Sequence, residues 1–310
     1  MSTGWRIARV SLTTADPDAA SAFYREALGF EQAGVEERAG EDFARLMGVE
    51  GARARVVLLR LGQQEVELVA FARPGRPYPP GSTGSDRWFQ HFAVVVSDMG
   101  AAYARLSAWP GWTPISTDGP QQLPPGSGGV SAFKFRDPEG HPLELLGFPA
   151  DRTPAAWRAP RGAGPCLGID HSAIVVGETA ASVAFYRRLG FEVSARSLNR
   201  GVEQERLDAV PGVKVEVTAL RPRAADGPPH LELLCYLPPS AGRPAPPDSR
   251  NNDVAATRLV LEARRGTESG DADVAAEGRP PTDDGPAVLL NGRRAALLRD
   301  PDGHRLVLLG

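Results

Sequence analysis

The side chains in this chain best suited to chemistry are two histidines and two glutamates, His91, Glu144, His171 and Glu232. Imidazole and carboxylate groups are common protein ligands of divalent metals. A single His or Glu on an apolar strand is more often a core or barrel-lining residue. Four of them at corresponding positions of a repeat favour a metal site instead.

The repeat that carries these residues consists of an apolar strand with one histidine and a closing phrase rich in leucine. The strand occurs at 88–96 and again at 167–176. The closing phrase, with its Asp-Pro-x-Gly-His turn, occurs at 137–146 and 300–309, and its Leu-Glu-Leu-Leu core returns at 230–234. Such recurrence indicates that the chain is built from copies of one supersecondary unit.

The first copy of the unit is predicted to be a βαβββ module. Alternating apolar and polar residues over 6–14 predict a half-buried strand. Asp16 and Pro17 then suit the start of a helix, which we expect to end at Gly29. Two further strands are predicted at 55–61 and 65–71.

Later segments repeat this order. In the second module we expect a helix at about 98–108 and strands at 130–135 and 142–148. The fourth module is degenerate, because its helix segment, 264–278, contains glycines and several aspartates and has little apolar periodicity. We therefore divide the chain into domain 1 (1–150, modules about 5–72 and 87–148), a Pro- and Gly-rich linker (151–165) and domain 2 (166–310, modules about 167–237 and 253–309).

Composition excludes several classes of function. The 310 residues carry a formal net charge of −3, and no basic run has interleaved aromatics, so we expect no nucleic-acid partner. Neither a signal peptide nor an apolar window of membrane-spanning length is present, so we expect no membrane partner. Cys166 and Cys235 are too few for a disulfide framework. We expect reduced thiols and a cytoplasmic protein.

The modules carry three sequence motifs: HxxVxV in the opening strands, AFYRxxLGF in a helix and DPxGHxLEL in a closing hairpin. In these motifs the chain resembles the vicinal oxygen chelate superfamily, which includes glyoxalase I, extradiol dioxygenases and bleomycin-resistance proteins. The likeness covers nearly the whole chain. It implies an α+β fold in which four βαβββ modules form two half-open mixed-sheet barrels.

The resemblance also implies where metal ligands would lie, namely on the first and last strands of each module. Carried over to this chain, the first-strand positions are Arg9, His91, His171 and Thr257. The last-strand positions are Glu67, Glu144, Glu232 and Val307.

The pairing of the modules decides which of these residues meet. If sequence neighbours pair, the first site contains His91, Glu144 and Glu67, with Arg9 intruding. Monomeric two-domain glyoxalases instead pair module two with module three, and module one with module four. That arrangement would bring His91, Glu144, His171 and Glu232 together. Every position that has lost its expected His or Glu would then lie in the other site, so we favour this arrangement.

Other candidate residues are given smaller roles. Arg9, Phe89 and Thr257 are candidates for a substrate pocket. His141 and His304 each lie three residues before the last-strand position of their module, Glu144 or Val307. Because side chains alternate along a strand, each histidine would face the opposite side of the sheet, so we expect neither to be a ligand. His230 shares the face of Glu232 and is a candidate for the rim of the site.

Three functions remain open. We favour a metal-dependent lyase or isomerase of glyoxalase type acting on a small oxygen-rich carbonyl substrate, with Glu144 or Glu232 leaving the metal to move a proton. The cofactor would be a divalent metal, Zn or Ni. The first alternative is an Fe(II) extradiol dioxygenase, and the second is a non-catalytic ligand-binding protein of the bleomycin-resistance type. We expect a small-molecule substrate and a monomer or homodimer.

Overall fold

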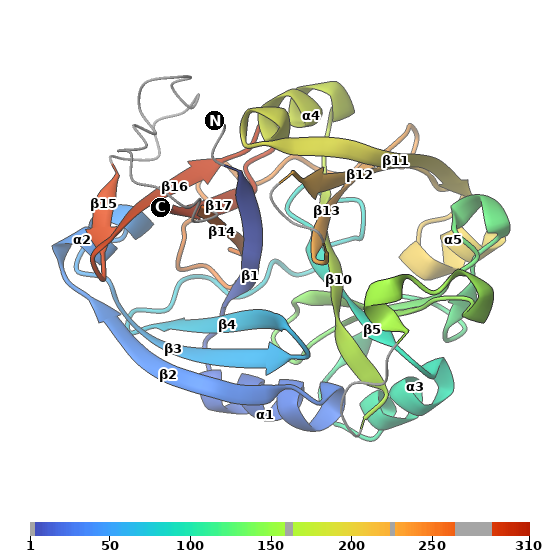
Figure 1. Cartoon of the computed structure of the whole chain (residues 1–310), viewed down its shortest axis with the longest axis horizontal. Coiled ribbons are helices and arrows are strands. Elements are labelled where there is room, and N and C mark those ends of the chain that lie inside the picture. Colours follow the sequence, from blue (N-terminus) through green and yellow to red (C-terminus); the bar gives the residue numbers. More distant parts are fainter. Residues whose placement is uncertain (1–3, 159–163, 224–226, 264–286) are drawn as a thin grey trace.

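A computed structural model of the protein describes residues 4–158, 164–223, 227–263 and 287–310. The poorly periodic segment 264–278 of module four lies outside these residues. Two mixed β-sheets and the helices packed on them make up the described chain (Figure 1).

The first sheet contains strands of modules one and four only. Its eight strands are, in spatial order, β15 (Val288–Leu290), β16 (Arg293–Arg299), β17 (Arg305–Leu309), β14 (Arg258–Ala263), β1 (Trp5–Thr13), β4 (Gln64–Phe71), β3 (Arg53–Leu61) and β2 (Glu31–Ala39). We refer to it as the outer-module sheet.

The second sheet contains strands of modules two and three only. Its order is β11 (Phe191–Arg200), β12 (Lys214–Pro222), β13 (His230–Tyr236), β10 (Cys166–Val175), β5 (Gln90–Val96), β9 (Pro142–Gly147), β8 (Ser131–Arg136) and β6 (Thr113–Pro114), with β7 (Gln121–Gln122) paired to β8. We refer to it as the inner-module sheet. The cross-paired arrangement of modules is thereby confirmed.

The described helices are short and join the strands of modules one, two and three. They are α1 (Pro17–Leu28), α2 (Glu41–Met47), α3 (Met99–Ser107), α4 (Thr179–Arg188) and α5 (Val202–Asp208), with 3-10 turns η1 (Pro125–Ser127), η2 (Ala150–Arg152) and η3 (Ala155–Trp157). None of the helices in the described residues is long and apolar enough to cross a membrane. Cys166 and Cys235 are both free thiols, the first buried and the second partly exposed.

Local sequence explains the first helix. The Asp16 carboxylate accepts hydrogen bonds from the backbone N–H groups of Asp18 and Ala19, which otherwise lack helical partners. The helix ends at Gly29, whose φ of 80° is left-handed and is tolerated because glycine has no Cβ. The predicted helix and the three predicted strands of module one are confirmed.

Two strand–helix pairs were not predicted, β2 with α2 and β11 with α5. Both strands lie at sheet edges, and no residue of β2 is buried. An exposed edge strand has no apolar alternation to detect. The helices that follow are only seven residues long, so they also lack a full period of apolar spacing.

One continuous apolar cluster joins the two sheets. It includes Val10 and Leu12 of β1, Phe92 and Val94 of β5, and buried residues of α1, α3 and α4. Two hydroxyl contacts bridge the sheets at its margin. Tyr24 of α1 donates to Asp137 before β9, and Tyr186 of α4 donates to Asp300 before β17. The first helix of module one and that of module three are therefore each tied to a closing hairpin of the other sheet.

Candidate metal centre

The four predicted ligands lie on four adjacent strands of the inner-module sheet, in the order β13, β10, β5 and β9. In the antiparallel pair of β5 and β10, His91 lies opposite Ala173 and His171 opposite Ala93. Ala93 in turn pairs with Glu144, and Ala173 with Glu232. Each glutamate therefore lies beside an alanine that comes two residues after a histidine. Side chains two positions apart on a strand face the same side of the sheet, so each glutamate faces the same side as a histidine.

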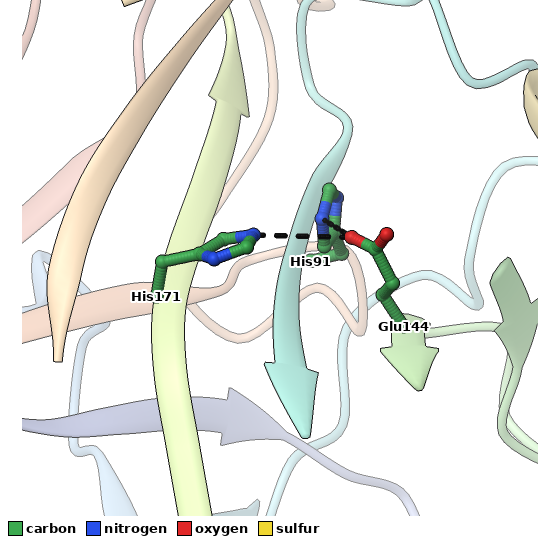
Figure 2. A group of neighbouring side chains, drawn as sticks. All are labelled: His91, Glu144 and His171. Carbon is green, nitrogen blue, oxygen red and sulfur yellow. Dashed lines mark hydrogen bonds and ion pairs between the residues drawn. The ribbon is translucent and has the colours of Figure 1, made fainter. Parts of the chain in front are cut away.

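Three of these side chains converge closely. His91 Nε2 lies 2.9 Å from Glu144 Oε2, and His171 Nε2 lies 3.8 Å from the same oxygen (Figure 2). Glu232 Oε2 lies 3.6 Å from His171 Nε2. The ligand atoms of His91, Glu144 and His171 all lie within 4.8 Å of one another, and all three residues are buried.

These separations suit a single divalent ion. Two atoms bound at about 2.1 Å to one metal lie about 3.0 Å apart at a right angle and about 3.4 Å apart in a tetrahedron. The observed values of 2.9, 3.6 and 3.8 Å bracket that range. Two imidazoles and one carboxylate, from His91, His171 and Glu144, form a donor set that such ions accept. These three residues therefore fit a divalent metal, and Glu232 lies beside them through its contact with His171.

A second contact orients His171. The register of β10 against β5 shifts between Ile169 and His171, and at this irregularity Asp170 turns its carboxylate to its neighbour. His171 Nδ1 donates to Asp170 Oδ2 over 3.2 Å, and Trp157 Nε1 donates to Asp170 Oδ1 over 2.9 Å. A carboxylate on Nδ1 fixes the tautomer that leaves Nε2 free to bind a metal.

Charge around the site favours ionised carboxylates. Burial opposes ionisation of Glu144, but the nearby imidazoles of His171 and His91 hold its pKa well below its usual range. Burial also opposes ionisation of Asp170, yet the hydrogen bond from His171 and the nearby imidazole charges lower its pKa to about 2. The site thus presents negative oxygen donors at neutral pH.

The four residues open into a cavity of about 300 Å³. Its walls also carry Lys134 of β8 and Gln204 of α5. Lys134 Nζ is buried and donates to Asp208 over 2.6 Å, while Gln204 Nε2 donates to the other oxygen of Asp208. Burial lowers the pKa of Lys134, but the charges of Asp208 and Glu144 outweigh it and raise that pKa.

Asp170, Lys134 and Asp208 were missed at the sequence level. Asp170 directly precedes His171, and that adjacency was an available signal, but strand alternation places neighbours on opposite faces unless the strand is irregular. Lys134 lies directly opposite Glu144 in the β8–β9 pairing, which the closing hairpin itself could have indicated.

The other histidines lie outside this donor set, as predicted for His141 and His304. His304 Nε2 donates to the Val175 carbonyl, and His141 is bound to Asp137. His230 is buried, with its Nε2 3.5 Å from Glu232 Oε1 and its Nδ1 3.6 Å from Asp170 Oδ2. Asp170, His171 and His230 also satisfy the spacing of a metal group, but Asp170 already engages Nδ1 of His171.

Phe89 is fully buried beside the site. Its ring lies 5.6 Å from that of His91 in an edge-to-face arrangement, and it packs in an apolar cluster with Val175 and Tyr236. It is absent from the cavity walls among the described residues. A direct role for Phe89 in a substrate pocket remains a prediction.

The corresponding positions of the outer-module sheet do not reproduce the donor set. Arg9 lies opposite Val260, and Val260 pairs with Val307, so the residue equivalent to His171 is Arg258. The alignment that placed Thr257 there was wrong by one residue. Module four has no histidine in its first strand by which the alignment could be fixed. Thr257 directly precedes β14 and lines a different cavity.

Arginines lie at or beside the corresponding positions of the outer-module sheet. Arg38 donates to both oxygens of Glu67, over 3.2 and 2.8 Å, and Arg9 lies 3.9 Å from Glu67. Burial opposes ionisation of Glu67, but Arg38 outweighs it and lowers the pKa. Arg258 is fully buried and donates to Thr13 and to the Asn251 carbonyl. Among the described residues, both groups with metal-like spacing belong to the inner-module sheet.

Comparison with protein families decides the relationship. The model described as Glyoxalase/Bleomycin resistance protein/Dioxygenase superfamily matches residues 6–145 and 168–308. The chain belongs to this superfamily. A search of curated proteins found no match.

Solved structures of superfamily members share the fold over nearly the full length. Glyoxalase I from Zea mays superposes with a TM-score of 0.60 at 16% identity, covering 98% of this chain and 92% of the maize chain. A single-substitution variant of the maize protein gives 0.61 at 18% identity, with coverages of 98% and 92%. At these identities the likeness concerns the fold alone.

Proposed function

We propose that the protein is a divalent-metal-dependent lyase or isomerase of glyoxalase type, acting on a small oxygen-rich carbonyl substrate. The observation that carries the proposal is the convergence of His91, Glu144, His171 and Glu232 from four strands on one cavity wall. Because one chain supplies the whole set, a monomer would suffice for this proposal.

In this proposal His91, His171, Glu144 and Glu232 hold the metal. The bound ion would polarise adjacent substrate oxygens and make the neighbouring C–H more acidic. Asp170 keeps Nε2 of His171 directed at the site. Trp157 in turn fixes Asp170, so that the orientation of His171 is set before substrate arrives.

The two glutamates have different surroundings, which suggests different roles. The side chain of Glu144 is 8% exposed and accepts a hydrogen bond from His91 over 2.9 Å, whereas that of Glu232 is 22% exposed and lies 3.5 Å or more from the imidazole nitrogens of His230 and His171. A carboxylate that moves a proton must leave its partners and return. Glu232 is the freer of the two, so we assign it the role of general base and Glu144 that of fixed ligand.

One observation favours a second candidate function. His91, His171 and Glu144 alone form a compact two-His, one-carboxylate group, which is the ligand pattern of Fe(II) oxygenases. If Glu232 remains outside the metal's ligands, an Fe(II)-dependent dioxygenase becomes the alternative. The identity of the metal thus separates the two proposals.

The test is metal reconstitution followed by two assays. The chelated protein is reloaded with Zn, Ni or, without air, Fe(II), and is offered thiol adducts of 2-oxoaldehydes and, separately, catechols. We expect conversion of the adducts by the Zn or Ni form without oxygen uptake. Oxygen uptake with catechol by the Fe(II) form alone would replace the lyase proposal. Failure to bind any of the three metals would favour a non-catalytic binding protein.

Single substitutions test the division of roles. Glu232→Gln should retain the metal and lower kcat by about 100-fold or more, because a general base contributes about that much. Glu144→Gln should lose the metal. Glu216→Gln, which alters an exposed glutamate on β12, is the matched control and should change neither. Full activity of Glu232→Gln would contradict the assignment.

A further inference from the structure

A second cavity, of about 330 Å³, lies apart from the metal centre. It is enclosed by the connector between β4 and β5, the connector between β13 and β14, and the turn before β17. The two cavities share no lining residue within the part of the chain that the structure describes. Gln90 lines this one and His91 the other, because consecutive residues of a strand face opposite sides of the sheet.

The wall of this cavity is mostly apolar and rigid. Several prolines and alanines line it together with Trp88. The indole Nε1 donates to Ser82 over 3.1 Å, and the Arg243 guanidinium lies 4.8 Å from the ring centroid. Because both contacts hold Trp88 in place, its ring is a preset surface for a flat apolar group. The volume lies near the lower end of the range for small-molecule sites, about 300–1,000 Å³.

The polar groups of the wall are predominantly cationic. Four arginines and one aspartate contribute to it, namely Arg76, Arg87, Arg250, Arg305 and Asp253. Arg76 is neutralised by Asp253 and Asp248, each at 2.8 Å. Arg305 is hydrogen-bonded to Asn251 and Ser249.

Two of the arginines form fewer ion pairs and side-chain hydrogen bonds with the described residues. Arg87 makes one ion pair, with Asp302 at 3.6 Å, and its side chain has no hydrogen bond to another described residue. Arg250 is exposed, and among the described residues its guanidinium forms no ion pair. An arginine with unused donors beside an apolar wall suits a planar carboxylate, which it can bind through two parallel hydrogen bonds.

We propose that this cavity binds a small aromatic carboxylate, with the ring against Trp88 and the carboxylate on Arg87. The site is distinct from the metal centre and does not depend on the reaction performed there. Excess positive charge selects against a cationic ligand, and the apolar wall selects against a simple inorganic anion.

The experiment is titration calorimetry of the full chain with benzoate, together with benzamide and benzylamine as neutral and cationic probes of similar shape. Benzoate should bind with a stoichiometry of one, and benzamide about tenfold or more weakly, because it lacks the charge that Arg87 pairs. Trp fluorescence should change with the same midpoint. Equal affinity for benzoate and benzamide, or no saturable binding of benzoate at millimolar concentration, would overturn the proposal.

Variants locate the site. Arg87→Gln should weaken benzoate binding about tenfold or more, and Arg87→Lys should retain much of it because the positive charge remains. Arg60→Gln, at an exposed β3 arginine paired with Glu65, is the matched control and should not change it. Circular dichroism of each variant checks folding. The affinity should be the same for metal-loaded and chelated protein, whereas loss on chelation would place benzoate at the metal centre and overturn the proposal.

Discussion

Asp170 is the residue whose contribution to the metal centre can be tested most selectively. It is not one of the four residues assigned to the metal, yet its carboxylate accepts the Nδ1 proton of His171. Asp170→Asn keeps the size of the side chain but removes the charge. We expect the metal dissociation constant to rise about 10- to 100-fold, as for other partners of ligating histidines.

The measurement is competition with a chromophoric chelator. Asp18→Asn, at an exposed aspartate of α1 paired with Arg55, is the control and should leave the constant unchanged. Wild-type affinity in Asp170→Asn would mean that His171 does not need this contact.

At the residue scale, the repeat predicted four members of the candidate site and missed their supports. His91, Glu144, His171 and Glu232 were found because each occupies a recurring position, and the structure brings them together. Asp170 has no carboxylate counterpart, since Gln90 precedes His91. Thr257 was misplaced because module four has lost both ligands, and only the strand register identifies Arg258.

At the scale of elements, the closing hairpin of module two has a buried histidine as its anchor. His141 Nδ1 donates to Asp137 over 2.8 Å, and Nε2 lies 3.0 Å from the Thr13 carbonyl and 3.1 Å from that of Val254. Both ring nitrogens therefore face acceptors, as in an imidazolium. Burial lowers the pKa of His141, but the Asp137 charge outweighs it and raises that pKa above its ordinary value of 6.5.

This contact predicts a pH dependence of stability. Because the folded-state pKa of His141 is raised, its contribution is fully present below about pH 6.5 and is lost as pH rises through the raised pKa. Burial opposes ionisation of Asp137, but His141 outweighs it and lowers the pKa. The contribution of Asp137 is therefore lost as pH falls below its ordinary value of 3.8.

His141→Gln should lower the free energy of unfolding by about 3 kcal/mol at pH 6, because it leaves a buried carboxylate without its charged partner. It should also flatten the alkaline decline. Urea unfolding between pH 5 and pH 9 is the measurement, with His304→Gln on the corresponding hairpin of module four as comparison. An unchanged pH profile in His141→Gln would show that His141 does not carry the charge.

Elements with a buried face were predictable, and edge elements were not. The strand β1 and the helix α1 bury one side and so show alternation and helical periodicity. By contrast β2 buries none of its residues, and α2 buries only Phe43, Leu46 and Met47. The position of β2 depends on its pairing with β3, and that of α2 on its packing against β15 and β16, which are tertiary contacts.

At the scale of the whole molecule, the two halves of the sequence interlock. The antiparallel pairs β1–β14 and β5–β10 each join a strand of residues 1–150 to one of residues 166–310. The sequence repeat predicted the four modules. It could not decide which modules pair, because a linker of this length permits either arrangement. The division into two sequence domains remains a prediction.

Separate expression of residues 1–150 and 166–310 tests the interlocking. Each half alone would expose the edges of β1 and β5, or of β10 and β14, and would contribute only one histidine and one glutamate to the donor set. We expect neither half to bind metal tightly, and co-expression to restore binding in a complex of the two. Tight stoichiometric binding by the first half alone would contradict the pairing.

Metal stoichiometry of single variants tests the central claim most directly. Elemental analysis of the metal-loaded wild-type chain should give one equivalent, held between modules two and three. His171→Ala should lose it, and Glu67→Gln, which alters the carboxylate bound by Arg38, should retain it. Two equivalents in the wild type, or loss in Glu67→Gln with retention in His171→Ala, would contradict the account.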